Sequence, residues 1–320
     1  MKMLSIIERE SYAVSAQLAE RLRELGAKAQ RPNTTKAYAA DWKVWSAWCA
    51  LHGVSTMPAD PQTVAAFIAD LSQTRKLSTL RRYLATISSA HTRADHYFDR
   101  HDRAIRMVMA GLREEKGDDT RRVKPLTADM LRGMHFEGTA IGIRDRALLF
   151  LGVASGCRRS ELAGLDWASP GAGSGYVRED GRGVVLVLLR TKTGAGKPQE
   201  VAVPHGPAVE ALYDWAALAD LADGEPVFRS IRRGGTIQTQ RLSTEAVARI
   251  VKQRCRAADL DAAEFSGHSL RAGLVTSAAE AGVERDRIKR HSRHKSDAIL
   301  EGYVRVANRF KDSVVEEIGL

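Results

Sequence analysis

The sequence predicts a mainly α-helical protein with a small antiparallel β-sheet, divided into a helical first domain and an α+β second domain. Three observations predict this class. Residues 34–115 carry apolar residues at helical spacing. Residues 114–125, "EEKGDDTRRVKP", are charged, nearly without apolar residues and closed by a proline, which is typical of an interdomain linker. Residues 183–204, "GVVLVLLRTKTGAGKPQEVAVP", combine an apolar strand, a turn rich in Gly and Lys, and a second strand.

The predicted organisation is a helical domain at 1–114, a linker at 115–125 and a second domain at 126–320. A chain of 320 residues is long enough for two domains with their own cores. With 44% hydrophobic and 28% charged residues, the composition is that of an ordinary globular protein.

Four helices are predicted in the first domain, at 34–53, 60–74, 77–97 and 102–115, the last ending near Gly111. Trp42, Trp45 and Trp48 recur every three residues on the first helix. We expect them in the core rather than on a platform for stacked bases, because this spacing keeps them on one side of a helix.

The second domain is predicted to begin with a helix capped by Thr127. Two helices follow, at 144–156 and 158–167, interrupted at Gly156. After the two strands, further helices are predicted around 207–221, 243–257, 268–281, 284–290 and 296–304.

The chain has a formal net charge of +10 and a pI of about 9.7, which favours a polyanionic partner, most simply nucleic acid. A basic protein without such a partner is the alternative. Cys49, Cys157 and Cys255 lie far apart without a C-x-x-C, so neither a disulfide framework nor a zinc site is predicted. The N-terminus is too charged for a signal peptide, and the apolar run at 147–154 is too short to cross a membrane. We expect a cytoplasmic protein.

Residues that could carry chemistry gather in the second domain. In "SGCRRSEL", Arg158 stands at the start of a helix, and Glu161 lies one turn later, within reach of it. In "GHSLRAG", His268 and Arg271 are three residues apart and face the same side of a helix. Lys192 lies where the apolar strand enters the turn. Taken singly, each of these residues also fits an ordinary surface or loop position.

A last motif, "RHSRHKSDAILEGYVR" at 290–305, places cations and two histidines before a single tyrosine. His294 follows Arg271 by 23 residues, and Tyr303 follows His294 by nine. A position in the core is the ordinary alternative for Tyr303. A zinc site is a further alternative, without supporting ligand spacing, and its ligands would be Cys255, His268, His291 and His294.

In this order and spacing the motifs resemble the boxes of the tyrosine recombinases, or phage integrases, over nearly the whole chain. The family's arginine, lysine, histidine, arginine, histidine or tryptophan, and tyrosine match Arg158, Lys192, His268, Arg271, His294 and Tyr303. The stretches "RTKT" and "LSTEAVARI" are similar to those of Cre-like members. The resemblance implies a SAM-like core-binding domain at 1–114, which contacts DNA, and a catalytic domain at 126–320.

One position departs from the family pattern. Many members carry a glycine immediately before the histidine or tryptophan of the third box, where this chain has Arg293, with a second histidine nearby at His291. The spacing to the tyrosine favours His294. Nine residues of straight helix span about 13.5 Å and end on opposite faces, so we expect His294 before a helix that starts near residue 297 and is capped by Ser296.

The resemblance implies cleavage of a DNA phosphodiester by Tyr303, which displaces the 5′ oxygen and stays linked to the 3′ phosphate. Arg158 and Arg271 would offset the charge that develops on the non-bridging oxygens, in place of a metal ion. His268 is the candidate base, and Lys192 is the candidate acid for the leaving oxygen.

Two further roles complete the implied site. His294 would donate a hydrogen bond to a non-bridging oxygen, and Glu161 would orient Arg158. No cofactor and no metal are implied. The implied partner is a double-stranded DNA target site bound by a cyclic homotetramer, whose C-terminal tails at 305–320 dock either on a neighbouring subunit or on their own domain.

The candidate DNA contacts are cations of the first domain and polar residues around the start of "LSTEAVARI". They are Lys36, Lys43, Arg75, Lys76, Arg81, Arg82, Gln240, Arg241 and Glu245, the last of which could accept from cytosine N4. Any solvated helix face would carry similar residues.

Three rival functions remain: a DNA-binding regulator without catalysis, a type IB topoisomerase-like enzyme and a telomere-resolving enzyme. The compact size favours recombination, and the intact residue set argues against the regulator. A metal nuclease would need paired carboxylates. We expect a nucleoid-associated protein of prokaryotic, phage or plasmid origin.

Overall fold

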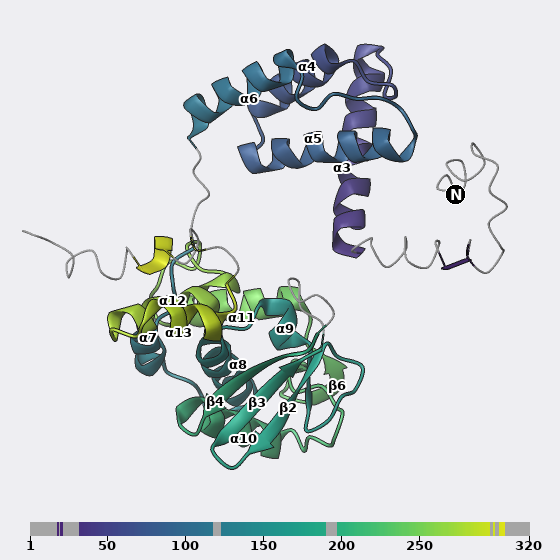
Figure 1. Cartoon of the computed structure of the whole chain (residues 1–320). Coiled ribbons are helices and arrows are strands. Elements are labelled where there is room, and N and C mark those ends of the chain that lie inside the picture. The colour runs from purple at the N-terminus through teal and green to yellow at the C-terminus, as the bar shows by residue number, and fades with distance from the viewer. Residues whose placement is uncertain are drawn as a thin grey trace, which may run out of the picture. The chain divides into compact units, whose positions relative to one another are not determined.

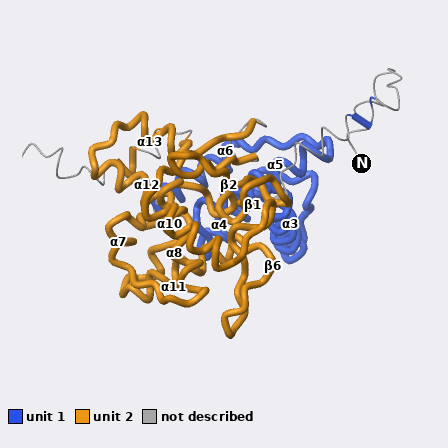
Figure 2. The backbone as a smooth tube through the Cα atoms, turned by 90° about the horizontal axis from the view of Figure 1, so that it is seen from below, with its two compact units in different colours: residues 1–121 blue, residues 122–320 orange. Residues whose placement is uncertain are grey.

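The structure, a computed structural model, describes residues 18, 20–21, 32–117, 123–189, 197–294, 297 and 301–304. The chain divides into two compact units, residues 1–121 and 122–320, which Figure 2 shows in different colours. Each unit has a hydrophobic core of its own. Within the described part, none of the helices combines the length and the apolar character that crossing a membrane requires.

Unit 1 is helical, as predicted. Between residues 32 and 117 its helices are α3 (Pro32–His52), α4 (Pro61–Ser72), α5 (Leu77–Arg93) and α6 (Arg103–Lys116) (Figure 1). Side-chain caps start two of them, because the carboxylates of Asp60 and Asp102 accept the backbone N–H groups of Thr63 at 3.0 Å and Ala104 at 2.7 Å.

The tryptophans of α3 belong to the core of unit 1, as predicted. Trp45 is completely buried, and the edge of its ring meets Phe67 at a centroid distance of 4.9 Å. Trp42 and Trp48 are partly buried against the same core. The indole N–H of Trp48 donates to the carboxylate of Asp70 at 2.7 Å, so its polar end is satisfied as well.

The prediction that the fourth helix ends near Gly111 is wrong. Helix α6 continues to Lys116 because Leu112, directly after the glycine, is 6% exposed and belongs to the core. The helix ends at Gly117, whose φ of +67° favours glycine. The first residues of the predicted linker, 115 and 116, are therefore helical.

The other end of the predicted linker belongs to unit 2. The backbone N–H of Lys124 donates to the carbonyl of Glu264 at 2.9 Å, and that of Leu126 donates to the carbonyl of Ser269 at 2.9 Å. Thr127 then caps the first helix of the unit through Met130, as predicted.

Unit 2 is an α+β unit. Its helices are α7 (Ala128–Gly133), α8 (Ala140–Ser155), α9 (Arg159–Ala163), α10 (Pro207–Leu218), α11 (Thr244–Ala257), α12 (His268–Glu280) and α13 (Arg285–Ser292). Residues 297 and 301–304 are also helical. The interruption between α8 and α9 falls at Gly156, as predicted.

Two small sheets complete unit 2 (Figure 1). The larger has the order β1 (Leu165–Trp167), β2 (Gly175–Asp180), β3 (Gly183–Leu188) and β4 (Gln199–Pro204), and the smaller pairs β5 (Arg229–Ile231) with β6 (Ile237–Arg241). The larger sheet is mixed rather than antiparallel as predicted, because β1 pairs with β2 in parallel. All six residues of β3 are buried, which explains its unbroken apolar sequence.

The predicted helix at 158–167 is too long. Its last residues form β1, because Leu165 is completely buried and the side chain of Asp166 turns inward to accept the backbone N–H groups of Gly171 and Gly173. Strand β2 and the β5–β6 pair were not predicted at all. They are short and largely polar, and their half-exposed residues leave little apolar alternation to detect.

Candidate active site

The end of α8 prepares the position of the first arginine. Gly156 ends this helix with φ of +57°, and a Cβ atom there would lie 2.5 Å from Cδ2 of Leu274. The next residue but one, Arg158, is the N-cap of α9. Glu161, in the first turn, accepts the backbone N–H of Arg158 at 2.9 Å and its Nη1 at 2.7 Å. The predicted pair between Arg158 and Glu161 is therefore present.

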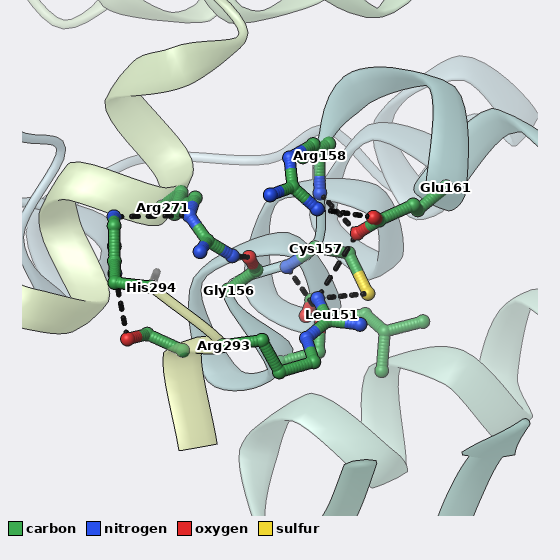
Figure 3. Close-up of polar contacts among 10 residues, drawn as sticks. Leu151, Gly156, Cys157, Arg158, Glu161, Arg271, Arg293 and His294 are labelled. Atoms are coloured by element: carbon green, nitrogen blue, oxygen red, sulfur yellow. Dashed lines mark hydrogen bonds and ion pairs between the residues drawn. The ribbon is translucent and has the colours of Figure 1, made fainter. Parts of the chain in front are cut away.

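Arg271 brings α12 to the same place. Its side chain is buried, with only 6% of the residue exposed. Nη1 donates to the carbonyl oxygen of Gly156 at 2.8 Å, and Nε donates to Nε2 of His294 at 3.2 Å (Figure 3). Nη2 of Arg271 is buried without a hydrogen-bond partner. This guanidinium therefore keeps an unpaired buried donor.

His294 stands between α13 and the helical residues 301–304, as predicted. Its Nδ1 lies 2.7 Å from Oγ of the buried Ser292. Because Nε2 accepts from Arg271, the proton of the neutral ring belongs on Nδ1, which then donates to Ser292. The ring nitrogen nearest to Arg271 is an acceptor in this arrangement.

The electrostatics of the cluster follow from burial and from its excess of cations. Burial, helped by the charges of Arg158 and Arg293, lowers the pKa of Arg271 to about 10. Burial and then the charges of Arg271, Arg158 and Arg293 lower the pKa of His294 to about 4, so the ring is neutral at neutral pH. Burial alone would raise the pKa of Glu161, but the charge of Arg293 and the hydrogen bonds from Arg158 outweigh it and lower that pKa.

The two histidines of the third motif have different environments. His291 lies on α13, and its Nε2 donates to the carbonyl oxygen of Ala154 at 2.8 Å. His294 is the one that contacts Arg271. The structure thus places His294 in the arginine cluster and uses His291 to tie α13 to α8.

The remaining predicted catalytic residues are less closely joined to this cluster. His268 is the first residue of α12, one turn before Arg271, and is exposed. Tyr303 is half-buried against the apolar cluster of Val275, Ala279 and Ile288. No hydrogen bond joins its hydroxyl to another residue of the described ranges. Lys192 and Ser296 lie outside the described residues, as do residues 305–320 of the predicted docking tail.

Two of the residues predicted to contact DNA form hydrogen bonds with other residues of the chain. Arg82 donates to both carboxylate oxygens of Asp41, at 2.7 and 2.8 Å. Arg241 donates to the carbonyl oxygens of Ala163 and Leu165, at 3.1 and 2.9 Å, and to the carboxylate of Asp166. Arg82 remains exposed all the same, and so are the other predicted contacts: Lys36, Lys43, Arg75, Lys76, Arg81, Gln240 and Glu245.

A metal centre finds no support in the part of the chain that the structure describes. Over those ranges, no group of three or more His, Cys, Asp or Glu side chains is arranged to hold a metal ion. Of the ligands in the zinc alternative, Cys255 is buried in the core of unit 2 and His291 is bonded to Ala154. Cys49, Cys157 and Cys255 are all buried free thiols.

Two members of the cluster were not predicted as site residues. Ser292 orients the His294 ring, and Arg293 reaches Glu161, with Nη2 3.0 Å from Oε2. A short serine side chain two residues before a histidine gives no signal of its own in a sequence. Arg293 did give one, since it stands where the chain departs from the common pattern.

The chain is similar to known proteins in sequence and in fold. Residues 126–309 match the phage integrase family. The chain is 35% identical over 304 residues to an integrase/recombinase XerD homolog of Selenomonas ruminantium. The matched region covers 91% of this chain and 86% of the relative. It is 27% identical over 298 residues to the recombinase Cre of Escherichia phage P1, with 85% and 84% covered.

A solved structure agrees on the fold. The Tn1549 transposon integrase, in complex with transposon right end DNA, superposes with a TM-score of 0.60 at 14% identity, over 94% of this chain and 98% of that one. From its sequence matches, the chain belongs to the phage integrase family of tyrosine recombinases, the site-specific recombinases that cleave and rejoin DNA strands.

Proposed function

We propose that Tyr303 is the nucleophile of site-specific strand exchange and that the arginine cluster holds the phosphate that it attacks. One observation carries the proposal. Arg158, Arg271 and His294 converge from three segments of unit 2, and Nη2 of Arg271 is buried without a partner. A non-bridging phosphate oxygen would satisfy this donor and offset the excess positive charge.

In the proposed cleavage step, the Tyr303 oxygen attacks phosphorus and the bond between phosphorus and the 5′ oxygen breaks. His268 takes the phenolic proton, and Lys192 gives a proton to the departing 5′ oxygen. The 3′-phosphotyrosyl link keeps the bond energy, so the 5′ hydroxyl of a partner strand can later displace the tyrosine. Every proton and bond is accounted for without an external energy source.

The guanidinium groups would stabilise the negative charge of the phosphate. Arg158 and Arg271 would donate to the non-bridging oxygens, where charge builds up in the transition state. Glu161 holds Arg158 in place through two hydrogen bonds. His294 would join them as a donor, for which its Nε2 must gain a proton, by protonation of the ring or by a shift to the other tautomer, and release its present contact with Arg271.

The proposal includes a movement of the tyrosine toward this phosphate. Its ring now rests on the apolar cluster formed by Val275, Ala279 and Ile288. In the proposal, binding of DNA draws the helical residues 301–304 away from this cluster and toward Arg271. Such a change would break the contacts of this small apolar cluster and the ion pair that Glu301 forms with Arg285 at 2.9 Å.

Double-stranded DNA is the proposed partner, and the solved structure of the Tn1549 integrase is a complex with transposon right end DNA. Exposed cations of unit 1 would bind its phosphates: Lys36, Lys43, Arg75, Lys76 and Arg81. Gln240 and Glu245, exposed around the start of α11, would face base edges. Exchange between two duplexes cuts four strands with one tyrosine each, so we propose a homotetramer on paired sites.

The test uses DNA that flanks the encoding locus, nicked so that cleavage traps the protein. Mixing, denaturing and electrophoresis should give a covalent protein–DNA adduct that is unaffected by EDTA and absent from the Tyr303→Phe variant. DNA binding by Tyr303→Phe without the adduct is the matching control. Binding by the parent chain without any adduct would favour the regulator and sink the proposal.

A further inference from the structure

Arg293 occupies a left-handed backbone position that favours glycine. It ends α13 with φ of +58°, and its N–H bonds to the carbonyl oxygens of Lys289 at 2.9 Å and Arg290 at 3.3 Å. A helix that ends in this left-handed conformation usually does so at a glycine, because a Cβ atom is crowded there. An arginine in this place suggests that its side chain contributes something that glycine cannot.

The Arg293 side chain turns inward. Only 8% of it is exposed, and Nη2 donates to Oε2 of Glu161 at 3.0 Å and lies 3.7 Å from the sulfur of Cys157 (Figure 3). Glu161 is itself 3% exposed. The contact joins the third motif to the first, across 132 residues of sequence.

The carboxylate of Glu161 is therefore shared between two arginines. Oε1 accepts from Nη1 of Arg158, while Oε2 accepts from the Arg158 backbone and from Arg293. A buried carboxylate that loses its only counter-ion is strongly destabilised. With Arg293 in place, Arg158 can turn its guanidinium toward a phosphate while Glu161 keeps a charged partner.

The cluster also holds more positive charge than its own groups neutralise. Arg158, Arg271 and Arg293 stand against one carboxylate, that of Glu161. Nε and Nη1 of Arg293 and Nη2 of Arg271 are buried without partners. Such an imbalance is costly in the free protein and is relieved by an anion.

We propose that Arg293 is a positioning residue for strand cleavage: it holds Glu161 so that Arg158 is free to bind the scissile phosphate, and its charge strengthens the attraction of that phosphate. This inference rests on the proposed function, in which Arg158 binds phosphate. Arg293 itself is buried beneath the site and acts through Glu161 and through its field.

Two variants that differ in charge test the idea, since both keep an unbranched side chain in the same left-handed position. Arg293→Lys retains the charge next to Glu161, whereas Arg293→Gln removes it. We expect single-turnover cleavage of the nicked site to fall roughly ten- to a hundredfold in Arg293→Gln and to be partly restored in Arg293→Lys. Arg293→Gly removes the guanidinium while relaxing the backbone, and it should cleave as slowly as the glutamine variant.

The titration of His294 distinguishes the loss of the Arg293 charge from a general loss of folding. The groups that face His294 are Arg271 from α12, Arg158 at the start of α9, Arg293 and the hydroxyl of Ser292. Because the charge of Arg293 lowers the pKa of His294, the ring should titrate at higher pH in Arg293→Gln and Arg293→Gly than in Arg293→Lys. NMR of the histidine ring in the free protein measures this order.

The outcomes are distinct. Equal cleavage and equal His294 titration in the lysine and glutamine variants would overturn the inference, as would an Arg293→Gly variant as fast as the parent. If the parent forms no Tyr303-dependent adduct, the proposed function fails, while the titration order still tests the charge of Arg293 by itself. If glycine prevents folding, the lysine and glutamine pair decides.

Discussion

Nε of Arg271 donates to Nε2 of His294 at 3.2 Å, so a charged guanidinium and a neutral imidazole share one hydrogen bond at the centre of the site. The imidazole stays neutral because burial, Arg271, Arg158 and Arg293 lower its pKa from 6.5 to about 4. A bound phosphate would reverse the effect of these charges. The protonation of His294 should therefore report on binding of DNA.

We predict that the pKa of His294 rises when target DNA binds to Tyr303→Phe, a variant that cannot cleave. An anion stabilises the protonated ring, so the complex takes up a proton at any pH between the free and the bound pKa. Histidine NMR with and without DNA measures the change, and calorimetry in two buffers of different ionisation enthalpy counts the proton. A ring that titrates near pH 4 in both states would contradict the prediction.

The same pKa shift bears on stability. A depressed folded-state pKa means that the unfolded chain binds the proton more tightly. The stabilising contribution of neutral His294 is thus complete above about pH 6.5 and is lost as the pH falls toward 4. Replacing His294 by Gln should flatten the pH dependence of unfolding over this window, compared with the parent chain.

Substitution of Arg271 by Lys should separate catalysis from binding. The guanidinium holds Gly156 and His294 at fixed angles and keeps one donor unused, and a single ammonium cannot reproduce this arrangement. Cleavage should fall by about 10²–10³, as for loss of a transition-state donor, with little change in DNA affinity. Arg256→Lys, at an exposed position of α11, is the matched control and should cleave normally.

A pair of glycines gives a test of packing. A Cβ atom on Gly273 of α12 would lie 1.8 Å from the carbonyl oxygen of Leu126, whereas one on Gly111 of α6 meets nothing within 4 Å. Gly273→Ala should destabilise unit 2 by about 1–3 kcal/mol because backbone must shift. Gly111→Ala should stabilise unit 1 by roughly 0.5–1 kcal/mol. Scanning calorimetry that resolves both units checks this, and equal effects would contradict it.

Some of the site could be predicted from the sequence because its determinants are local. The pairing of Arg158 with Glu161 follows from a spacing of three on one helix, and the exclusion of His294 from the helix of Tyr303 follows from helical geometry. The contact of Arg293 with Glu161 joins residues that are 132 positions apart. No local pattern encodes such a contact, since it depends on how α13 packs against α8 and α9.

The same limit applies to the surface cations. Arg81 and Arg82 are indistinguishable in the sequence, as two basic residues on the polar face of one helix. Only the fold brings Asp41 of α3 opposite Arg82. Likewise, Arg241 is turned inward by Asp166, which is predicted in a helix and lies in β1.

Arg82 and Arg75 should therefore respond differently to replacement by Gln. Asp41 is 3% exposed and is held by two bonds from Arg82 and one from Thr86 at 3.2 Å. Arg82→Gln leaves this buried carboxylate poorly paired and should destabilise unit 1 by about 1–3 kcal/mol.

Arg75→Gln, at an exposed position, should leave unfolding unchanged. It should instead weaken DNA binding and reduce the slope of log affinity against log salt by about 1, because one phosphate contact is lost. Thermal unfolding of unit 1 and a salt titration of DNA binding measure both variants side by side. If Arg82→Gln lowered the salt slope as much as Arg75→Gln at unchanged stability, Arg82 would be a DNA contact and its pair with Asp41 would be incidental. If instead Arg82→Gln lowers only the stability and Arg75→Gln lowers only the salt slope, the pair of Arg82 with Asp41 holds α3 against α5. The neighbouring exposed cations then bind the phosphates.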